Sequence, residues 1–163
     1  MERWLPVVGF DGYEISDFGD ARSVDRWITF SDGRQRFYRG QPLIVMVQKK
    51  TGYRYINVRR LGRFFIHVAM LEAFVGPRPT GAEARHLDDD PAHNLLPNLA
   101  WGTRSQNQRD RVLNGRDPNA NKTHCASGHE YSPGNTYIYP DGHRACRICV
   151  ARWQREYRNR KKG

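Results

Sequence analysis

Short runs of alternating hydrophobic and polar positions, separated by turn residues, fill the first part of the chain. Aromatic and aliphatic residues between Trp4 and Ser23 alternate with glycine and aspartate, which is typical of short strands joined by tight turns. The run 42–48 and the strictly alternating run 53–59 predict two further strands. Residues 24–41 are polar and arginine-rich, and they predict a hairpin or a mobile loop.

The spacing of apolar residues then becomes helical. Val68, Leu71 and Phe74 fall on one face of a helix that is predicted over residues 67–74. His67 lies at the start of this helix, where we expect a cap or a structural hydrogen-bonding residue.

A second hairpin and helix are predicted in the centre of the chain. A short alternating run ends at His86, an acidic loop that contains proline follows, and a second run leads from Leu99 to Trp101. A helix is then predicted over residues 104–114, with Gly115 as its C-cap. This order, a hairpin followed by a helix, allows polar side chains of the strands and the helix to converge.

The composition favours small modules over one large core. Of the 163 residues 38% are hydrophobic, and the mean hydropathy is −0.81, so a single core would be thin. No run of about 18 apolar residues is present, which excludes a transmembrane helix. The N-terminus has no apolar signal region, and we therefore expect a cytoplasmic protein.

The charge of the chain is strongly positive and is concentrated near the C-terminus. The formal net charge is +10 and the pI is about 9.9. Residues 1–103 hold 14 lysines and arginines against 12 acidic residues, a net of +2, whereas residues 104–163 hold 13 against 5, a net of +8. This distribution predicts a polyanionic partner, and a merely solvated basic tail is the alternative.

Cysteine and histidine residues after a linker at 116–123 have the spacing of a zinc site. The three cysteines are odd in number and lie in the last quarter of the chain, which argues against a disulfide scaffold. The candidate ligands are Cys125, His129, Cys146 and Cys149, and their shell would be closed, so the Zn2+ would be structural. His124 and His143 are alternatives with poorer spacing. Residues 136–143 predict a hairpin, and Cys146 and Cys149 are expected to open the last helix.

That last helix, predicted over residues 145–160, combines a basic face with an apolar seam. Val150, Trp153 and Tyr157 form the seam. The candidate DNA-binding residues are Arg147, Arg152, Arg155, Arg158, Arg160 and Lys161, with Lys162 beyond them. Arginine contacts phosphate bidentately, so binding should weaken as salt is added.

Two stretches of the chain resemble a known family. The pattern W-x-x-V-x-G-F-x-x-Y-x-I-S-x-x-G-x-x-R-S over residues 4–23 resembles the small motif that precedes the nuclease domain in many HNH homing endonucleases. Arg85-His86, then Asn94, Asn98-Leu99-x-Trp101 and Asn107, resemble the H-N-N form of the HNH family itself. The zinc spacing is similar to that of C-terminal modules on phage-type HNH proteins, and the ligand order suggests a treble-clef finger.

The resemblance implies a ββα-metal fold and a role for each motif residue. His86 would be the general base, Asn98 would brace the loop and the histidine, and Asn107 would face a divalent cation, Mg2+ or Mn2+. An imidazole suits the removal of a proton from water near neutral pH. An amide oxygen suits a hard cation, which would stabilise the charge that develops on the phosphate.

Arg85 departs from the family pattern. Many members have an acidic metal ligand at this position, immediately before the histidine. Asp110, three residues after Asn107 on the same helical face, is a candidate second ligand. Arg85 would otherwise neutralise the scissile phosphate, or would mark a site that has lost its activity. The acidic triplet 88–90 is expected to serve turn formation, and His93 to be a bystander.

The sequence therefore predicts an α+β protein of small modules. Residues 1–41 would form the N-terminal motif, residues 42–115 the ββα-metal nuclease domain, and residues 116–163 a linker with a treble-clef-like, zinc-binding basic module. The predicted function is a Mg2+-dependent DNA endonuclease of the phage-type homing or nicking kind, acting on double-stranded DNA, in the bacterial host cytoplasm if a phage encodes it. The alternative is a catalytically inactive, sequence-specific DNA-binding protein. The target sequence, the number of strands cut, and the choice between monomer and homodimer stay open.

Overall fold

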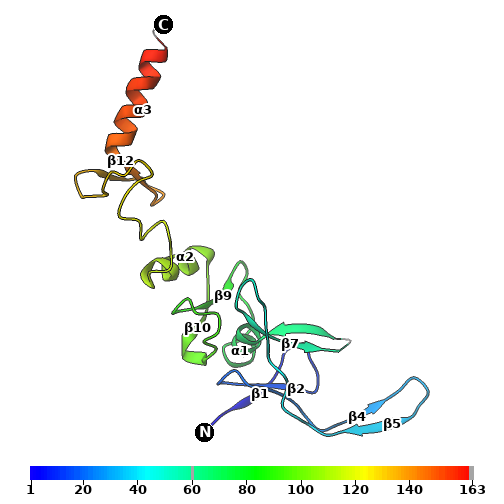
Figure 1. Ribbon diagram of the computed structural model, residues 1–163. Coiled ribbons are helices and arrows are strands. Elements are labelled where there is room, and N and C mark those ends of the chain that lie inside the picture. Colours follow the sequence, from blue (N-terminus) through cyan, green and yellow to red (C-terminus); the bar gives the residue numbers. More distant parts are fainter. Residues whose placement is uncertain (60, 162–163) are drawn as a thin grey trace. The chain divides into compact units, whose positions relative to one another are not determined.

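The computed structural model describes residues 1–59 and 61–161 of the protein, which has a mixed α+β fold (Figure 1). The chain divides into two compact units, Met1–Asn114 and Gly115–Gly163, which are described separately. Lys162, predicted to extend the basic helix, lies outside the described residues. None of the described helices is long and apolar enough to cross a membrane.

The N-terminal residues form a small antiparallel sheet, as their alternation predicts. Its order is β1 (Trp4–Pro6), β2 (Tyr13–Ser16) and β3 (Ala21–Ser23), with β2 in the middle. Ile15 and Ala21, which are register partners, are buried. This sheet therefore contributes its apolar face to the core of the first unit.

A separate hairpin follows, formed by β4 (Arg26–Thr29) and β5 (Gln35–Tyr38). The hairpin extends away from the rest of the first unit (Figure 1). The rings of Trp27 and Phe37 pack against each other with centroids 5.4 Å apart, although both side chains are largely exposed. Of the two alternatives for residues 24–41, the structure has the hairpin.

A second three-stranded antiparallel sheet contains β6 (Met46–Val47), β7 (Arg54–Val58) and β8 (Gly62–Phe65). The strand predicted over 42–48 is wrong in extent, because this run is divided between two sheets. Its start is bonded to the first sheet, where the Leu43 amide donates to the Ala21 carbonyl at 2.9 Å. Only its end pairs with β7, and Ile44 between them is 86% exposed.

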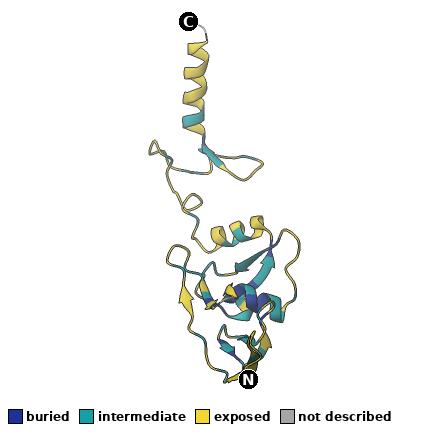
Figure 2. Ribbon diagram, turned by 90° about the vertical axis from the view of Figure 1, so that its right-hand side faces the viewer, coloured by how far each residue is buried: buried dark blue, intermediate teal, exposed yellow. Residues whose placement is uncertain are grey.

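Helix α1 (Ile66–Phe74) lies at the centre of the first unit and contacts strands of both three-stranded sheets and of the central hairpin. Its buried residues are Ile66, His67, Ala69, Met70 and Leu71. They occupy more of the circumference than the single face predicted from Val68, Leu71 and Phe74, because the helix is packed from several sides. Figure 2 shows this concentration of buried residues.

The central hairpin and helix agree with the predicted order. Strands β9 (Glu83–His86) and β10 (Leu99–Gly102) are antiparallel, with His86 opposite Leu99. The short 3-10 helix η1 (Leu96–Asn98) precedes β10, and α2 (Arg104–Leu113) follows it. Thr103 caps α2 in a capping box with Gln106, which fixes where the helix begins.

The second unit contains a hairpin and one helix. Strands β11 (Thr136–Ile138) and β12 (Arg144–Cys146) pair antiparallel, and α3 (Arg147–Arg160) follows directly. The helix begins two residues later than predicted, because Ala145 and Cys146 pair with β11. Cys146 therefore ends a strand and is the N-cap of α3, and Cys149 lies in its first turn.

Candidate active site and candidate metal centre

Helix α2 lies along one face of β9 and its continuation. Two side chains of α2 and that of its C-cap, about one turn apart, make the contacts: Asn107 with Glu83, Asp110 with Arg85, and Asn114 with the Leu87 carbonyl. Alternate residues of a strand point to the same side, so the odd-numbered positions of β9 face the helix. His86 belongs to the other face of the strand, which is turned toward the core.

Arg85 and Asp110 form an ion pair between β9 and α2. Their side chains are only 16% and 15% exposed. Arg85 Nε is buried with no hydrogen-bond partner among the described residues, and a Cβ built on Gly102 would overlap it. Gly102 thus leaves the room that Arg85 occupies. The carboxylate that the sequence offers as a second metal ligand is the counter-ion of this guanidinium.

Glu83 provides the carboxylate beside Asn107. The amide of Asn107 donates from Nδ2 to Glu83 Oε2 at 3.4 Å. Glu83 was not among the candidate residues, although strand alternation places it two positions before Arg85 and therefore on the same face. The helix-facing side of the hairpin thus holds an amide and a carboxylate at one end and an ion pair at the other.

His86 ends β9 and is 5% exposed. Its Nε2 lies 3.1 Å from Asn94 Oδ1, and its ring centroid is 5.0 Å from that of His67 and 6.0 Å from that of Tyr53. Burial lowers the pKa of His86, against the hydrogen bond to Asn94 and the charges of Asp88 and Asp90, which raise it. The imidazole is therefore not protonated to the imidazolium near neutral pH.

His67 is not a helix cap. It is the second residue of α1, and its side chain is buried and stacked on Tyr53 with centroids 4.7 Å apart. Its Nδ1 has no hydrogen-bond partner among the described residues. Burial, and secondarily the neighbouring His86, lower the pKa of His67 to about 3. His67 is thus an uncharged side chain that packs beside His86.

Asn98 closes the loop between β9 and β10. Its Nδ2 donates to Asp88 Oδ1 at 2.9 Å and to the His93 carbonyl at 2.8 Å, and its Oδ1 accepts from the Asp88 amide at 3.2 Å. The side chain at hydrogen-bonding distance from the His86 ring is that of Asn94 instead. Asn98 is linked to the His86 strand through the loop backbone, where the Leu87 amide donates to the Asn98 carbonyl at 2.8 Å.

His93 takes part in this loop and is not a bystander. Its Nδ1 lies 2.5 Å from Asp88 Oδ2. Desolvation raises the pKa of Asp88, but hydrogen bonds from His93 and Asn98 outweigh it and lower the value to about 2. Asp88 also accepts from the Asp90 amide at 2.9 Å. Through these contacts Asp88 stabilises the turn, which is the role expected of the acidic triplet.

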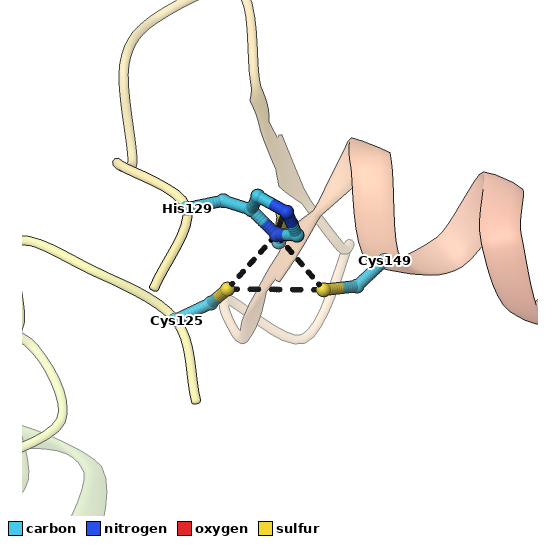
Figure 3. A group of neighbouring side chains, drawn as sticks. Cys125, His129 and Cys149 are labelled. Carbon is cyan, nitrogen blue, oxygen red and sulfur yellow. Dashed lines mark hydrogen bonds between the residues drawn. The ribbon is translucent and has the colours of Figure 1, made fainter. Parts of the chain in front are cut away.

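The four predicted zinc ligands converge in the second unit. Figure 3 shows Cys125, His129 and Cys149 pointing toward one another, and the ligand atoms of these three and of Cys146 all lie within 4.8 Å of one another. The Cys125 and Cys149 sulfurs are 3.7 Å apart, and His129 Nδ1 is 3.3–3.6 Å from the three sulfurs. His143 contacts Asp141 instead.

The Cys125–Cys149 separation and the three nitrogen–sulfur separations fit a tetrahedrally coordinated metal ion. With metal–sulfur bonds of about 2.3 Å and a metal–nitrogen bond of about 2.0 Å, a tetrahedron places two sulfurs about 3.8 Å apart and sulfur and nitrogen about 3.5 Å apart. Asn135 supports the group, because its Nδ2 lies 3.4 Å from Cys146 Sγ and its Oδ1 accepts from the Ile148 amide at 3.2 Å. The group could hold a metal such as zinc.

Helix α3 has no buried residue. The side chains of Trp153 and Tyr157 stack on each other, with centroids 5.5 Å apart. The six described basic residues proposed to contact DNA are all exposed: Arg147, Arg152, Arg155, Arg158, Arg160 and Lys161. The helix therefore presents its charge to solvent.

Comparison with known proteins identifies the class. Residues 2–59 match the NUMOD4 motif and residues 64–109 match the HNH endonuclease family. The chain therefore contains an HNH endonuclease domain preceded by a NUMOD4 motif, as the resemblance in its sequence implied.

A solved structure of DNA binding and cleavage by the HNH homing endonuclease I-HmuI has the same fold. It is 21% identical in sequence, with a TM-score of 0.54 over 88% of this chain and 76% of that chain. A search of curated proteins gave no significant match.

Proposed function

We propose that the protein is a DNA endonuclease that hydrolyses phosphodiester bonds, of the homing or nicking kind. The observation that carries the proposal is His86, a buried and neutral histidine at the end of the first strand of an HNH hairpin. The similar protein I-HmuI binds and cleaves DNA. The basic charge of the chain suits the same substrate.

In this proposal His86 removes the proton from the attacking water. A neutral imidazole is a competent base near pH 7, and burial keeps His86 in that form. Asn98 holds the loop closed through Asp88 and His93. Asn98 thereby restrains the loop that follows His86, because it binds both Asp88 near the start of the loop and His93 farther along it.

A divalent cation, Mg2+ or Mn2+, would be held at Asn107. The donor set there fits a hard cation, because the amide of Asn107 lies beside the Glu83 carboxylate. Asp110 is less suited than the sequence suggests, since its charge is compensated by Arg85. When bound, the cation would supply charge stabilisation for the phosphate and for the departing oxygen.

The second unit would be a zinc-stapled DNA-binding module of the treble-clef kind. A Cys3His shell leaves no open position, so a zinc ion there would stabilise the fold and take no part in hydrolysis. The exposed basic residues of α3 would then contact phosphates of the double helix.

A catalytically inactive, sequence-specific DNA-binding protein is the second candidate. The Arg85–Asp110 ion pair favours it, because Arg85 stands where many family members have an acidic metal ligand and also neutralises Asp110, the other candidate ligand. The two candidates differ in one outcome, which is hydrolysis of DNA.

The deciding experiment maps new DNA ends after incubation with a diverse library of duplexes, because the target sequence is open. We expect 5′-phosphate and 3′-hydroxyl ends at defined sites with Mg2+ or Mn2+ and none with EDTA. His86→Ala should abolish them, and His143→Ala, at an exposed histidine outside the site, should not. Cleavage that survives His86→Ala would refute the assignment of His86 as the general base. Absence of cleavage with either metal would favour the catalytically inactive DNA-binding protein.

A further inference from the structure

Asn94 occupies a buried position between His86 and the backbone of the β9–β10 loop. It is 4% exposed. Its Nδ2 faces two carbonyl oxygens, that of Ala92 at 3.3 Å and that of Pro91 at 3.5 Å. Its Oδ1 faces His86 Nε2 at 3.1 Å. The nitrogen of this amide thus faces backbone carbonyls, and its oxygen faces the imidazole of His86.

The two carbonyls determine which way the amide points. A carbonyl oxygen only accepts, so the nitrogen of the Asn94 amide must lie on that side and its oxygen must lie toward His86. An amide oxygen also only accepts, so His86 Nε2 must carry the proton that is donated. In the neutral ring the basic lone pair then belongs to Nδ1.

The N-terminal motif packs directly against Asn94. Gly19, in the turn between β2 and β3, has a φ of +85°, and a Cβ on it would lie 2.7 Å from the Asn94 carbonyl oxygen and 3.1 Å from Asn94 Cβ. The Leu96 amide donates to the Asp17 carbonyl at 3.3 Å. Ser16 Oγ shapes the turn by accepting from the Asp20 amide at 3.0 Å. The turn therefore forms one wall of the pocket that holds Asn94.

We propose that Asn94 is a positioning residue that holds His86 as the Nε2–H tautomer, so that Nδ1 is the basic atom, and that the β2–β3 turn of the NUMOD4 motif keeps Asn94 in place. This inference rests on the proposed function for the role of His86 as the base. It makes the N-terminal motif a structural part of the nuclease centre as well as a neighbouring module.

The other groups around His86 are compatible with this assignment. His67 faces it from α1 and Tyr53 from the segment before β7. Asp88, Asp90 and His93 act on it from its own loop. His67 and Tyr53 contact the His86 ring through their own rings, whereas Asn94 Oδ1 lies within hydrogen-bonding distance of its Nε2. Asn94 is thus the group whose chemistry selects the protonated nitrogen.

The test reads the tautomer directly, by two-bond nitrogen–proton correlation spectra of the full-length, zinc-loaded, nitrogen-15-labelled protein at pH 7.5. In the wild type we expect His86 with a protonated Nε2 and an unprotonated Nδ1. Asn94→Ala should give a mixture of tautomers, whereas Asn94→Asp, which keeps an acceptor, should retain the wild-type pattern. A wild-type protein with its proton on Nδ1, or an Asn94→Ala variant with an unchanged pattern, would overturn the proposal.

A matched pair of glycine variants tests the contribution of the N-terminal motif. Gly19→Ala and Gly9→Ala both put a side chain at positive φ, but only the first meets Asn94, because nothing lies within 4 Å of a Cβ on Gly9. We expect a changed His86 tautomer in Gly19→Ala alone. Equal spectra for the two variants would refute the claim that the β2–β3 turn keeps Asn94 in place.

The rate of DNA cleavage tests the functional consequence of this inference. On a mapped substrate, Asn94→Ala should lower kcat on the order of 10- to 100-fold, the cost typical of losing a partner that orients a functional histidine, with little change in KM. Asn94→Asp should have a kcat close to that of the wild type. In this variant the acid limb of the pH–rate profile should shift to higher pH, because an anion stabilises the imidazolium. A fixed tautomer in a protein without cleavage would refute the proposed function alone, whereas cleavage with an unchanged rate in Asn94→Ala would refute this inference alone.

Discussion

His67 should make the stability of the first unit strongly dependent on pH. The residue is 6% exposed, and its Nδ1 has no hydrogen-bond partner among the described residues. Burial, with a smaller effect of His86, lowers its pKa from 6.5 to about 3. Between these two pH values the unfolded chain binds a proton that the folded chain excludes. The free energy of unfolding must therefore decrease as the pH falls from about 6.5 toward 3.

The size of the effect follows from the linkage relation. Each pH unit in this window costs about 1.4 kcal/mol, so a change from pH 7.5 to pH 5 removes about 2 kcal/mol through His67. His67→Phe abolishes this titration. It also removes an unpartnered buried nitrogen, whose burial costs about 1–3 kcal/mol. We expect the variant to be at least as stable as the wild type at pH 7.5, and to lose about 2 kcal/mol less at pH 5.

The assay is a urea titration at both pH values, followed through the indole N–H signal of Trp101. This group donates to the Gly76 carbonyl at 3.1 Å, so it reports on the first unit without interference from zinc release in the second. His143→Phe, at an exposed histidine of the second unit, is the control. An equal loss of stability in the wild type and in His67→Phe would refute the reasoning, because His67 would then bind its proton in the folded state.

Three further predictions concern the metal, the DNA and the ion pair. The protein should bind one zinc ion, and Cys146→Ser should lower both its zinc content and the melting temperature of the second unit; purified protein free of zinc would contradict this. Replacing Arg152, Arg155 and Arg158 with alanine should flatten the dependence of DNA affinity on salt, by about 0.9 in slope for each phosphate that α3 no longer neutralises, and an unchanged slope would exclude α3 from the interface. Arg85→Asp would place two carboxylates together, so Mg2+ should raise the melting temperature of this variant more than that of the wild type, and equal increments would count against a ligand role for position 85.

The elements that the sequence predicts well are those specified by neighbouring residues. The hairpin and helix around His86 follow from strand alternation and from the capping box at Thr103, both of which are local signals. The cysteine and histidine spacing similarly brings the zinc ligands together, because a tight turn and one helical turn complete the geometry. The start of α3 differs from its predicted position by two residues, since pairing with β11 extends the preceding strand.

The errors lie where distant parts of the chain meet. The run 42–48 has the composition of one strand, but its two ends pair with different sheets. The burial of α1 on several sides depends on two sheets and a hairpin, none of which contributes to the local periodicity of the helix. For the same reason His67 resembles a cap in the sequence and is a buried neighbour of His86 in the structure.

The candidate site was predictable in its backbone and less so in its side-chain contacts. His86 and Asn107 fall on a strand and a helix whose order is clear from the sequence. Glu83 could have been found by counting two residues back from Arg85. Asn94 belongs to the pattern that resembles the family, but its contact with His86 was not predictable, because it depends on how the loop folds between Pro91 and η1.

The departure at Arg85 changes where a cation is expected on the helix-facing side of the hairpin. Because Arg85 and Asp110 compensate each other, that end of the face carries no net charge and offers a cation little attraction. Glu83 keeps its negative charge beside the amide of Asn107, one helical turn away from the pair. A cation would therefore bind toward Glu83, and the arginine would compete with it only if Asp110 were also a ligand. On this argument Arg85 is compatible with an active centre, provided that the acidic ligand has moved two positions along the strand.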